Sequence, residues 1–301
     1  MKIRDILAKG EPTLSFEVFP PKTTEVYESV KSAVSDIVRL GPDFMSVTYG
    51  AGGGTSAYTV EMASLVKDAG VASTAHLTCV SSSKETVRAQ IEKLKAQGIE
   101  NIMALRGDRP HDMPEGAVGE YRYASELIGE IKAAGDYCIG GACYPEGHPE
   151  SASFYDDIEH LKAKVDAGCD YLVTQMFFDN NIMYNFLYRL RRAGITVPVV
   201  AGIMPVLNAK QIMRSAKLSG TALPRRFLTI VDRFGDDAGA MAQAGIAFAT
   251  EQMIDLIANG VENIHLYTMN KPSTADAIQR NLSCIVPSAG RAVAERDGVK
   301  A

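Results

Sequence analysis

The sequence has 301 residues, of which 46% are hydrophobic and 22% are charged, and it carries a formal net charge of -5 at pH 7. This composition excludes a largely disordered chain, and without a block of basic residues there is no footprint for nucleic acid, so a small-molecule substrate is favoured. The start of the chain does not resemble an export signal, and no apolar stretch approaches membrane-spanning length. We therefore expect a cytoplasmic protein and not a membrane protein.

The first predicted strand, residues 15–19, places a glutamate among aromatic residues. Apolar and polar side chains alternate there before two prolines end the strand, so Ser15 and Glu17 share one face. In a closed barrel that face is the interior, where a carboxylate must be hydrogen-bonded, open to a cavity or protonated. On an edge strand Glu17 would instead point to solvent, and this alternative stays open.

Short apolar segments recur along the chain and alternate with segments of helical periodicity. The expected strands are residues 15–19, 44–49, 73–78, 102–105, 138–143, 172–178, 199–203 and 264–268. A long helix that starts at Asp236 and Asp237 precedes the last strand, and no linker divides the chain. The alternation predicts one domain over residues 1–301, an α/β fold of the (β/α)8 TIM-barrel type with an extra long helix before the eighth strand. An open doubly wound sheet is the alternative.

Local signals add detail to this outline. Ser82 with Glu85 forms a capping-box pattern that predicts the start of a helix, and Asn208 is expected to cap a helix that carries Gln211. The glycine-rich residues 50–54 lack the spacing of a phosphate-binding loop. Residues 291–301 are polar enough to fray.

Polar side chains stand at or just after most of the predicted strand ends. They are Glu17, Thr48, His76, Asp108, Tyr144, Gln175 and Tyr267. The carboxyl ends of all barrel strands meet at one mouth, so one shared site explains these residues better than separate solvated turns. His76 as a core histidine bonded to backbone, and Asp108 as an ordinary turn residue, remain alternatives. The unlike settings of the two carboxylates predict a raised pKa for Glu17 and an ionised Asp108.

The loop after residues 138–143 is polar and stiffened by two prolines, which suits a positioned site. It carries Glu146 and His148, but no third ligand follows at zinc-like spacing, so no metal site is predicted. The next helix carries polar residues about one turn apart, a pattern that alone is typical of a solvated face: Asp157, His160 and Lys164.

Together these segments resemble one known family. The motifs are SFEVFPP (15–21), VTYGA (47–51), HLTC (76–79), LRGD (105–108), YPEGHPE (144–150), TQMFFD (174–179) and HLYTMN (265–270). In this order they are similar to methylenetetrahydrofolate reductase, of the single-domain bacterial type without a C-terminal regulatory extension. Each motif alone is weak, whereas the ordered set covers nearly the whole chain and is specific.

The resemblance implies an oxidoreductase of one-carbon metabolism. Such a barrel contains FAD, takes hydride from NADH or NADPH and passes it to 5,10-methylenetetrahydrofolate in a ping-pong scheme, which gives 5-methyltetrahydrofolate. Glu17 matches the family's general acid, which assists opening of the folate ring, and Asp108 matches the carboxylate beside flavin and pterin. The implied substrate contacts are Glu17, Asp108, Gln175, Gln211 and Lys271.

The resemblance also implies where the cofactor lies. The matching positions are Thr48, His76, Leu105, Arg106, Gly107, Asp108, Tyr123, Ala124, Tyr144, His148, Asp157, His160 and Lys164. Lys164 suits the FAD pyrophosphate by its charge. Three positions depart from the family pattern. Ala163 replaces an arginine near the FAD phosphates, Ser215 replaces an aromatic residue that packs on bound nucleotide, and Lys271 replaces an arginine.

These departures leave two other functions open. One is a reductase that has lost flavin and moves hydride directly from nicotinamide to folate, which Ala163 motivates. The other is a non-catalytic or partner-fed subunit that binds folate or flavin and receives electrons from another protein. The sequence does not distinguish NADH from NADPH, and it leaves open whether the chain forms a homo-oligomer or needs an electron-transfer partner.

Overall fold

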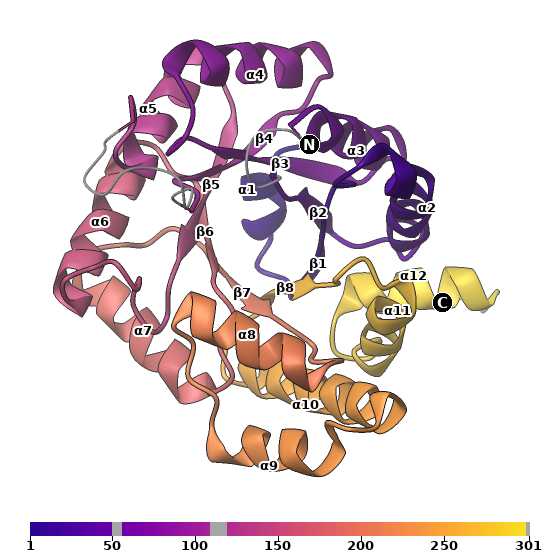
Figure 1. The fold of residues 1–301 in the computed structure, drawn as a ribbon. Helices are drawn as coiled ribbons and strands as arrows, with labels where there is room; N and C mark the ends of the chain where they lie inside the picture. Colours follow the sequence, from indigo (N-terminus) through magenta and orange to yellow (C-terminus); the bar gives the residue numbers. More distant parts are fainter. Residues whose placement is uncertain (50–55, 109–118, 299–301) are drawn as a thin grey trace.

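A closed barrel of eight parallel strands forms the centre of the molecule (Figure 1). The computed structural model describes residues 1–49, 56–108 and 119–298. Each strand pairs with the next one in the chain, and the last pairs with the first. The strands are β1 (Thr13–Val18), β2 (Phe44–Val47), β3 (Ala72–Thr78), β4 (Asn101–Leu105), β5 (Cys138–Cys143), β6 (Tyr171–Thr174), β7 (Val199–Ile203) and β8 (Asn263–Tyr267). The predicted TIM barrel is confirmed.

Helices surround the barrel, and Figure 1 shows them as an outer ring, with α1 alone drawn inside it. They are α1 (Ile3–Leu7), α2 (Tyr27–Val38) after a short 3-10 turn η1 (Thr24–Val26), α3 (Ser56–Asp68), α4 (Lys84–Ala96), α5 (Ala124–Ala134), α6 (Phe154–Asp166), α7 (Asn180–Arg192), α8 (Ala209–Ser219), α9 (Arg225–Phe234), α10 (Ala238–Ala258), α11 (Pro272–Asn281) and α12 (Pro287–Asp297). α10 is the predicted long helix before the eighth strand, and it begins after Asp237, whose side chain accepts hydrogen bonds from Gly239 and Ala240 N–H. The sequence analysis missed α1, α9 and α12.

Three local expectations need correction. Ser83 caps α4 instead of Ser82, because its Oγ accepts the Thr86 N–H at 3.1 Å. The predicted sixth strand was too long: β6 ends at Thr174, so Gln175 lies just beyond it. The C-terminal residues do not fray from position 291, because α12 continues to Asp297. Arg296 anchors that helix through a hydrogen bond to the Leu40 carbonyl, 2.8 Å long.

The strand pattern sorts side chains between the barrel interior and the helices. Phe16 and Val18 pack outward into the main apolar core, whereas Ser15 and Glu17 make contacts inside the barrel with His265, on β8. This confirms the interior position predicted for both polar residues of β1. No helix in the described ranges is long and apolar enough to cross a membrane. The glycine-rich residues 50–54 lie outside the described residues.

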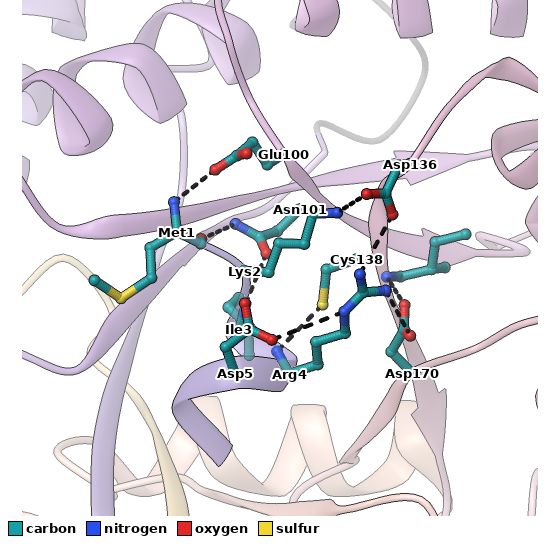
Figure 2. Close-up of polar contacts among 11 residues, drawn as sticks. Met1, Lys2, Ile3, Arg4, Asp5, Glu100, Asn101, Asp136, Cys138 and Asp170 are labelled. Atoms are coloured by element: carbon teal, nitrogen blue, oxygen red, sulfur yellow. Dashed lines mark hydrogen bonds and ion pairs between the residues drawn. The ribbon is translucent and has the colours of Figure 1, made fainter. Parts of the chain in front are cut away.

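Helix α1 closes the amino-terminal end of the barrel (Figure 2). Ile3, Ile6 and Leu7 are buried in an apolar cluster with residues at the starts of the strands. The Ile3 N–H donates to Asn101 Oδ1 at 2.8 Å, and Arg4 contacts Asp170 at 3.2 Å. Because this end is plugged, the opposite mouth, at the carboxyl ends of the strands, is left for a ligand.

Candidate active site

Glu17 lies at the centre of a buried polar cluster near the mouth. The strand register places Ser46 of β2 beside it, and the Ser46 hydroxyl donates to Glu17 Oε2 over 3.3 Å. Two histidine Nε2 atoms lie near the same oxygen, that of His76 at 3.6 Å and that of His265 at 3.8 Å. The Glu17 side chain is 14% exposed, so it is not fully sealed from solvent.

The ring of His265 is held on both sides. Its Nδ1 lies 2.7 Å from Ser15 Oγ and its Nε2 lies 3.0 Å from Ser46 Oγ. The ring also stacks on Phe44, with centroids 5.7 Å apart. This leaves His265 with one orientation, in which it faces the Glu17 carboxylate.

The expected raised pKa of Glu17 is wrong for the protein on its own. Burial raises the pKa of Glu17, but contacts with His265, His76 and Ser46 stabilise the carboxylate and together lower the pKa below its usual value. The pKa of His76 is also lowered, because its burial outweighs the attraction of Glu17. The sequence analysis placed His76 at the same mouth as Glu17, but it did not foresee that His76 and His265 both face the carboxylate.

These shifts predict how stability depends on pH. His76 has a folded-state pKa below that of the unfolded chain, so its contribution is complete above about pH 6.5 and is lost as the pH falls through the folded-state value. We expect His76→Gln to lose less stability than the parent protein between pH 7.5 and 5.5, a range above the titration of Glu17. Urea unfolding at the two pH values measures this. Equal losses in both proteins would contradict the assignment.

Tyr267 and Gly202 complete the wall beside Glu17. The Tyr267 hydroxyl donates to the Thr174 carbonyl at 2.5 Å, and Gly202 N–H donates to Thr174 Oγ1 at 2.9 Å. Burial and the neighbouring Glu17 raise the pKa of Tyr267, which keeps the phenol neutral. The hydrogen bond of Tyr267 thus links β8 to β6, on the other side of β7.

A second polar group lies at the ends of β4 and β5. Arg106 forms a two-pronged ion pair with Glu150, with N···O distances of 2.5 and 2.9 Å. The rings of Tyr144 and His148 meet edge to face at 4.6 Å. Burial, together with the nearby charge of Asp108, raises the pKa of Tyr144 to about 12. β4 pairs with β3, which carries His76, so the two polar groups are neighbours around the mouth.

Helix α6 adds a third set of predicted cofactor residues. Asp157 is buried and accepts a hydrogen bond from Ser151 Oγ at 3.2 Å, whereas His160 is exposed and packs on the Tyr123 ring at 5.0 Å. The Lys164 ammonium donates to the Ala142 carbonyl at 2.8 Å, and burial lowers its pKa. Lys164 is therefore directed at the barrel wall, and contact with a phosphate would require it to share or leave that bond.

The remaining predicted positions lie at the rim. Gln175 is half-buried, and its Oε1 accepts the Met176 N–H at 2.9 Å. Gln211 is exposed on α8, which Asn208 caps as predicted, and Lys271 is the exposed residue before α11. Thr48, Leu105 and Gly107 continue the ends of β2 and β4, and Ala124 begins α5. Within the described residues, no hydrogen bond or ion pair joins Gln175, Gln211 or Lys271 to Glu17.

The sequence analysis missed Ser15, Ser46 and His265 as functional residues. One signal could have found His265: it alternates with Tyr267 on the eighth strand, so both side chains point into the barrel. Among the residues that the structure describes, no group of three or more His, Cys, Asp or Glu could hold a metal ion.

Comparisons with known proteins support the resemblance. The sequence profile of the methylenetetrahydrofolate reductase family matches residues 2–283. The 5,10-methylenetetrahydrofolate reductase of Escherichia coli is 35% identical over 275 residues, which cover 91% of this chain and 92% of that protein. Methylenetetrahydrofolate reductase (NADH) 1 of Arabidopsis thaliana is 37% identical over 298 residues, 94% of this chain but 50% of that protein. The chain thus spans about half the length of the plant relative.

A solved structure shares the fold. An uncharacterized protein from Clostridium thermocellum, described as binding two copies of 5-methyl-5,6,7,8-tetrahydrofolic acid, superimposes with a TM-score of 0.63. The two sequences are 16% identical, and the match covers 93% of this chain and 99% of that one. At this identity the likeness supports the barrel fold alone.

Proposed function

This chain belongs to the methylenetetrahydrofolate reductase family, and we propose that it reduces 5,10-methylenetetrahydrofolate to 5-methyltetrahydrofolate, with hydride from NADH or NADPH passing through bound FAD. The observation that carries the proposal is Glu17. It is an almost buried carboxyl at the barrel mouth, with a serine hydroxyl and two histidine rings around one of its oxygens. Such a group can hold and release a proton where bulk water is largely excluded.

Glu17 acts as the general acid for opening of the folate imidazolidine ring. A proton on the departing nitrogen favours ring opening to an iminium, which hydride then reduces. Because the pKa of Glu17 is lowered in the free protein, this role requires that substrate binding raise it. A bound pterin would cover the remaining exposed part of the carboxyl, and this desolvation raises the pKa toward the range that an acid needs.

The residues at the ends of β3, β4 and β5 fit a flavin. Arg106 Nε is a buried nitrogen without a hydrogen-bond partner among the described residues, as expected where a ligand supplies the partner. His76 Nε2 also lacks a hydrogen bond, although Glu17 Oε2 lies 3.6 Å away. Gly107 has φ +83°, and a Cβ there would lie 3.0 Å from Thr78 Cβ, so any other residue at this strand end would be strained. Bound FAD would accept hydride from the nicotinamide and deliver it to the folate.

The other predicted residues then have defined tasks. His76, Arg106, Gly107 and Tyr144 would hold the flavin ring region, while Asp108 would stabilise the cationic iminium by its charge. Tyr123, Ala124, His148, Asp157, His160 and Lys164 would hold the remainder of the cofactor, with Thr48 and Leu105 along its edge. Gln175 would contact the pterin, and Gln211 and Lys271 would contact other parts of the folate. We propose that residues 1–301 act as one catalytic domain, since these groups all lie on one barrel.

Direct hydride transfer without flavin is the second candidate. Two observations favour it. Position 163, exposed on α6, carries alanine and so supplies no positive charge, and the neighbouring Lys164 donates to the Ala142 carbonyl. Both weaken the expected binding site for the FAD phosphates. A partner-fed subunit is the third candidate, and the intact Glu17 and Asp108 argue against it.

Product analysis tests the proposal. Purified protein, with and without added FAD, is incubated with 5,10-methylenetetrahydrofolate and either NADH or NADPH, and 5-methyltetrahydrofolate is quantified by chromatography. We expect product only when flavin is bound. Turnover by colourless protein would support direct transfer, and turnover that requires a second protein would support a partner-fed subunit. Either result would contradict the proposed route.

A further inference from the structure

We propose that Asn270, together with Thr268, is a positioning residue that keeps Glu17 correctly placed relative to Lys271 at the barrel mouth. The inference rests on the proposed function, because it concerns the general acid and a folate contact. It assigns a role to a turn after β8 that the proposed mechanism does not use. Asn270 itself is not a catalytic residue here, since it acts through the main chain just after β1.

The side chains of Thr268 and Asn270 extend the pairing of β8 with β1. The strand register ends where Glu17 is opposite Tyr267. Beyond it, Thr268 Oγ1 donates to the Glu17 carbonyl at 2.6 Å. Asn270 Nδ2 donates to the Phe19 carbonyl at 3.0 Å, and Asn270 Oδ1 accepts the Phe19 N–H at 2.9 Å. One side-chain amide thus satisfies both main-chain groups of Phe19.

The turn that carries this amide is strained. Met269 and Asn270 both have φ +52°, and they are the two non-glycine residues with positive φ in the described ranges. Asparagine tolerates this left-handed conformation, but methionine adopts it rarely. Such backbone persists where surrounding contacts enforce it, and it occurs preferentially at functional sites. The Asn270 bonds to Phe19 are contacts of this kind.

The same turn determines where Lys271 lies. Its N–H donates to the Thr268 carbonyl at 2.9 Å, and Pro272 then begins α11. Glu17 and Lys271 are therefore joined through a short bonded path that runs from β1 through Thr268 and Asn270. A proton donor and a cation whose main-chain positions are linked in this way suit one extended substrate that touches both.

The barrel itself does not need this connection. β1 and β8 already pair from Thr13 opposite Asn263 to Glu17 opposite Tyr267. Asn270 is half-buried at the mouth and adds its two bonds after the paired region ends. Its loss should therefore loosen the end of β1 without opening the barrel.

The test compares Asn270→Gly with Asn270→Asp. Glycine keeps the positive φ and removes the amide, whereas aspartate keeps an acceptor for the Phe19 N–H but repels the Phe19 carbonyl. Asn259→Gly is a control for the loss of an asparagine amide that bonds main chain. Asn259 Nδ2 donates to the Asp255 carbonyl at 2.8 Å, but Asn259 lies after α10 at the other end of the barrel and has φ -102°. The full chain is used, and thermal unfolding monitors folding.

We expect Asn270→Gly to weaken binding of 5-methyltetrahydrofolate, measured by calorimetry, and to slow the folate step, by about ten- to a hundredfold. Flavin reduction by NADH and the thermal midpoint should stay close to those of the control. Asn270→Asp should recover part of the loss and serves as the test if the glycine variant does not fold. Unchanged folate binding, or an equal loss in both half-reactions, would overturn the positioning role. The proposed function would fail separately, if the parent protein with bound FAD formed no 5-methyltetrahydrofolate from 5,10-methylenetetrahydrofolate and either NADH or NADPH.

Discussion

Replacing Glu17 by glutamine is expected to slow folate reduction by about 10²- to 10⁴-fold, the range that loss of a general acid covers. Glutamine has nearly the same shape and can still bond Ser46, but it cannot give up a proton to a departing nitrogen. Reduction of the flavin by nicotinamide needs no proton from this position, so it should be largely unchanged. Stopped-flow spectroscopy measures the two half-reactions separately.

The control for this change is Glu85→Gln. Glu85 is exposed in the first turn of α4, so the same chemical change there should leave both half-reactions as they are. If Glu17→Gln kept rapid folate reduction, the acid would have to be another group. If it lost both half-reactions equally, Glu17 would serve cofactor binding or folding instead.

Replacing Gly202 by alanine is expected to destabilise the protein by about 1–3 kcal/mol, as overpacking of a tight core does. A Cβ at Gly202 would overlap the Tyr267 hydroxyl and the Thr174 carbonyl oxygen, which are bonded to each other. The methyl group would force Tyr267 away from the wall beside Glu17. We therefore expect both a lower urea midpoint and a slower folate step.

Gly129→Ala is the control, and it is expected to stabilise the protein where Gly202→Ala destabilises it. Gly129 lies inside α5, and nothing stands within 4 Å of a Cβ built there. Alanine at such a position should stabilise the helix by about 0.5–1 kcal/mol. Equal unfolding midpoints for the parent and Gly202→Ala would contradict the packing described for Tyr267.

The barrel could be predicted because its strands are short apolar segments, which differ clearly from the segments of helical periodicity between them. β5, β7 and α10 lie where the sequence places them, and the long helix had a clear acidic start at Asp237. α1 was missed because five residues are too few for a periodic pattern, and its burial depends on the open end of a barrel that only the whole chain forms. α12 was missed because its anchor is tertiary: Arg296 bonds Leu40, far away in the sequence.

The candidate site could be predicted in its residues but not in its electrostatics. Alternation along β1 placed Glu17 inside the barrel, and the structure confirms it. The pKa of Glu17 depends on His76 from β3 and His265 from β8, and no local pattern brings these three together. The hydrogen bond from Lys164 to the Ala142 carbonyl likewise could not be predicted from the sequence, because it depends on how α6 packs against β5.

The most direct test of the proposed function is a visible absorption spectrum of the purified protein under anaerobic conditions. NADH or NADPH is added first and 5,10-methylenetetrahydrofolate second. We predict flavin bands that bleach with the nicotinamide and return with the folate, since a single site serves both substrates in turn. A protein without flavin bands, or bands that no nicotinamide bleaches, would contradict the proposed flavin-dependent reductase.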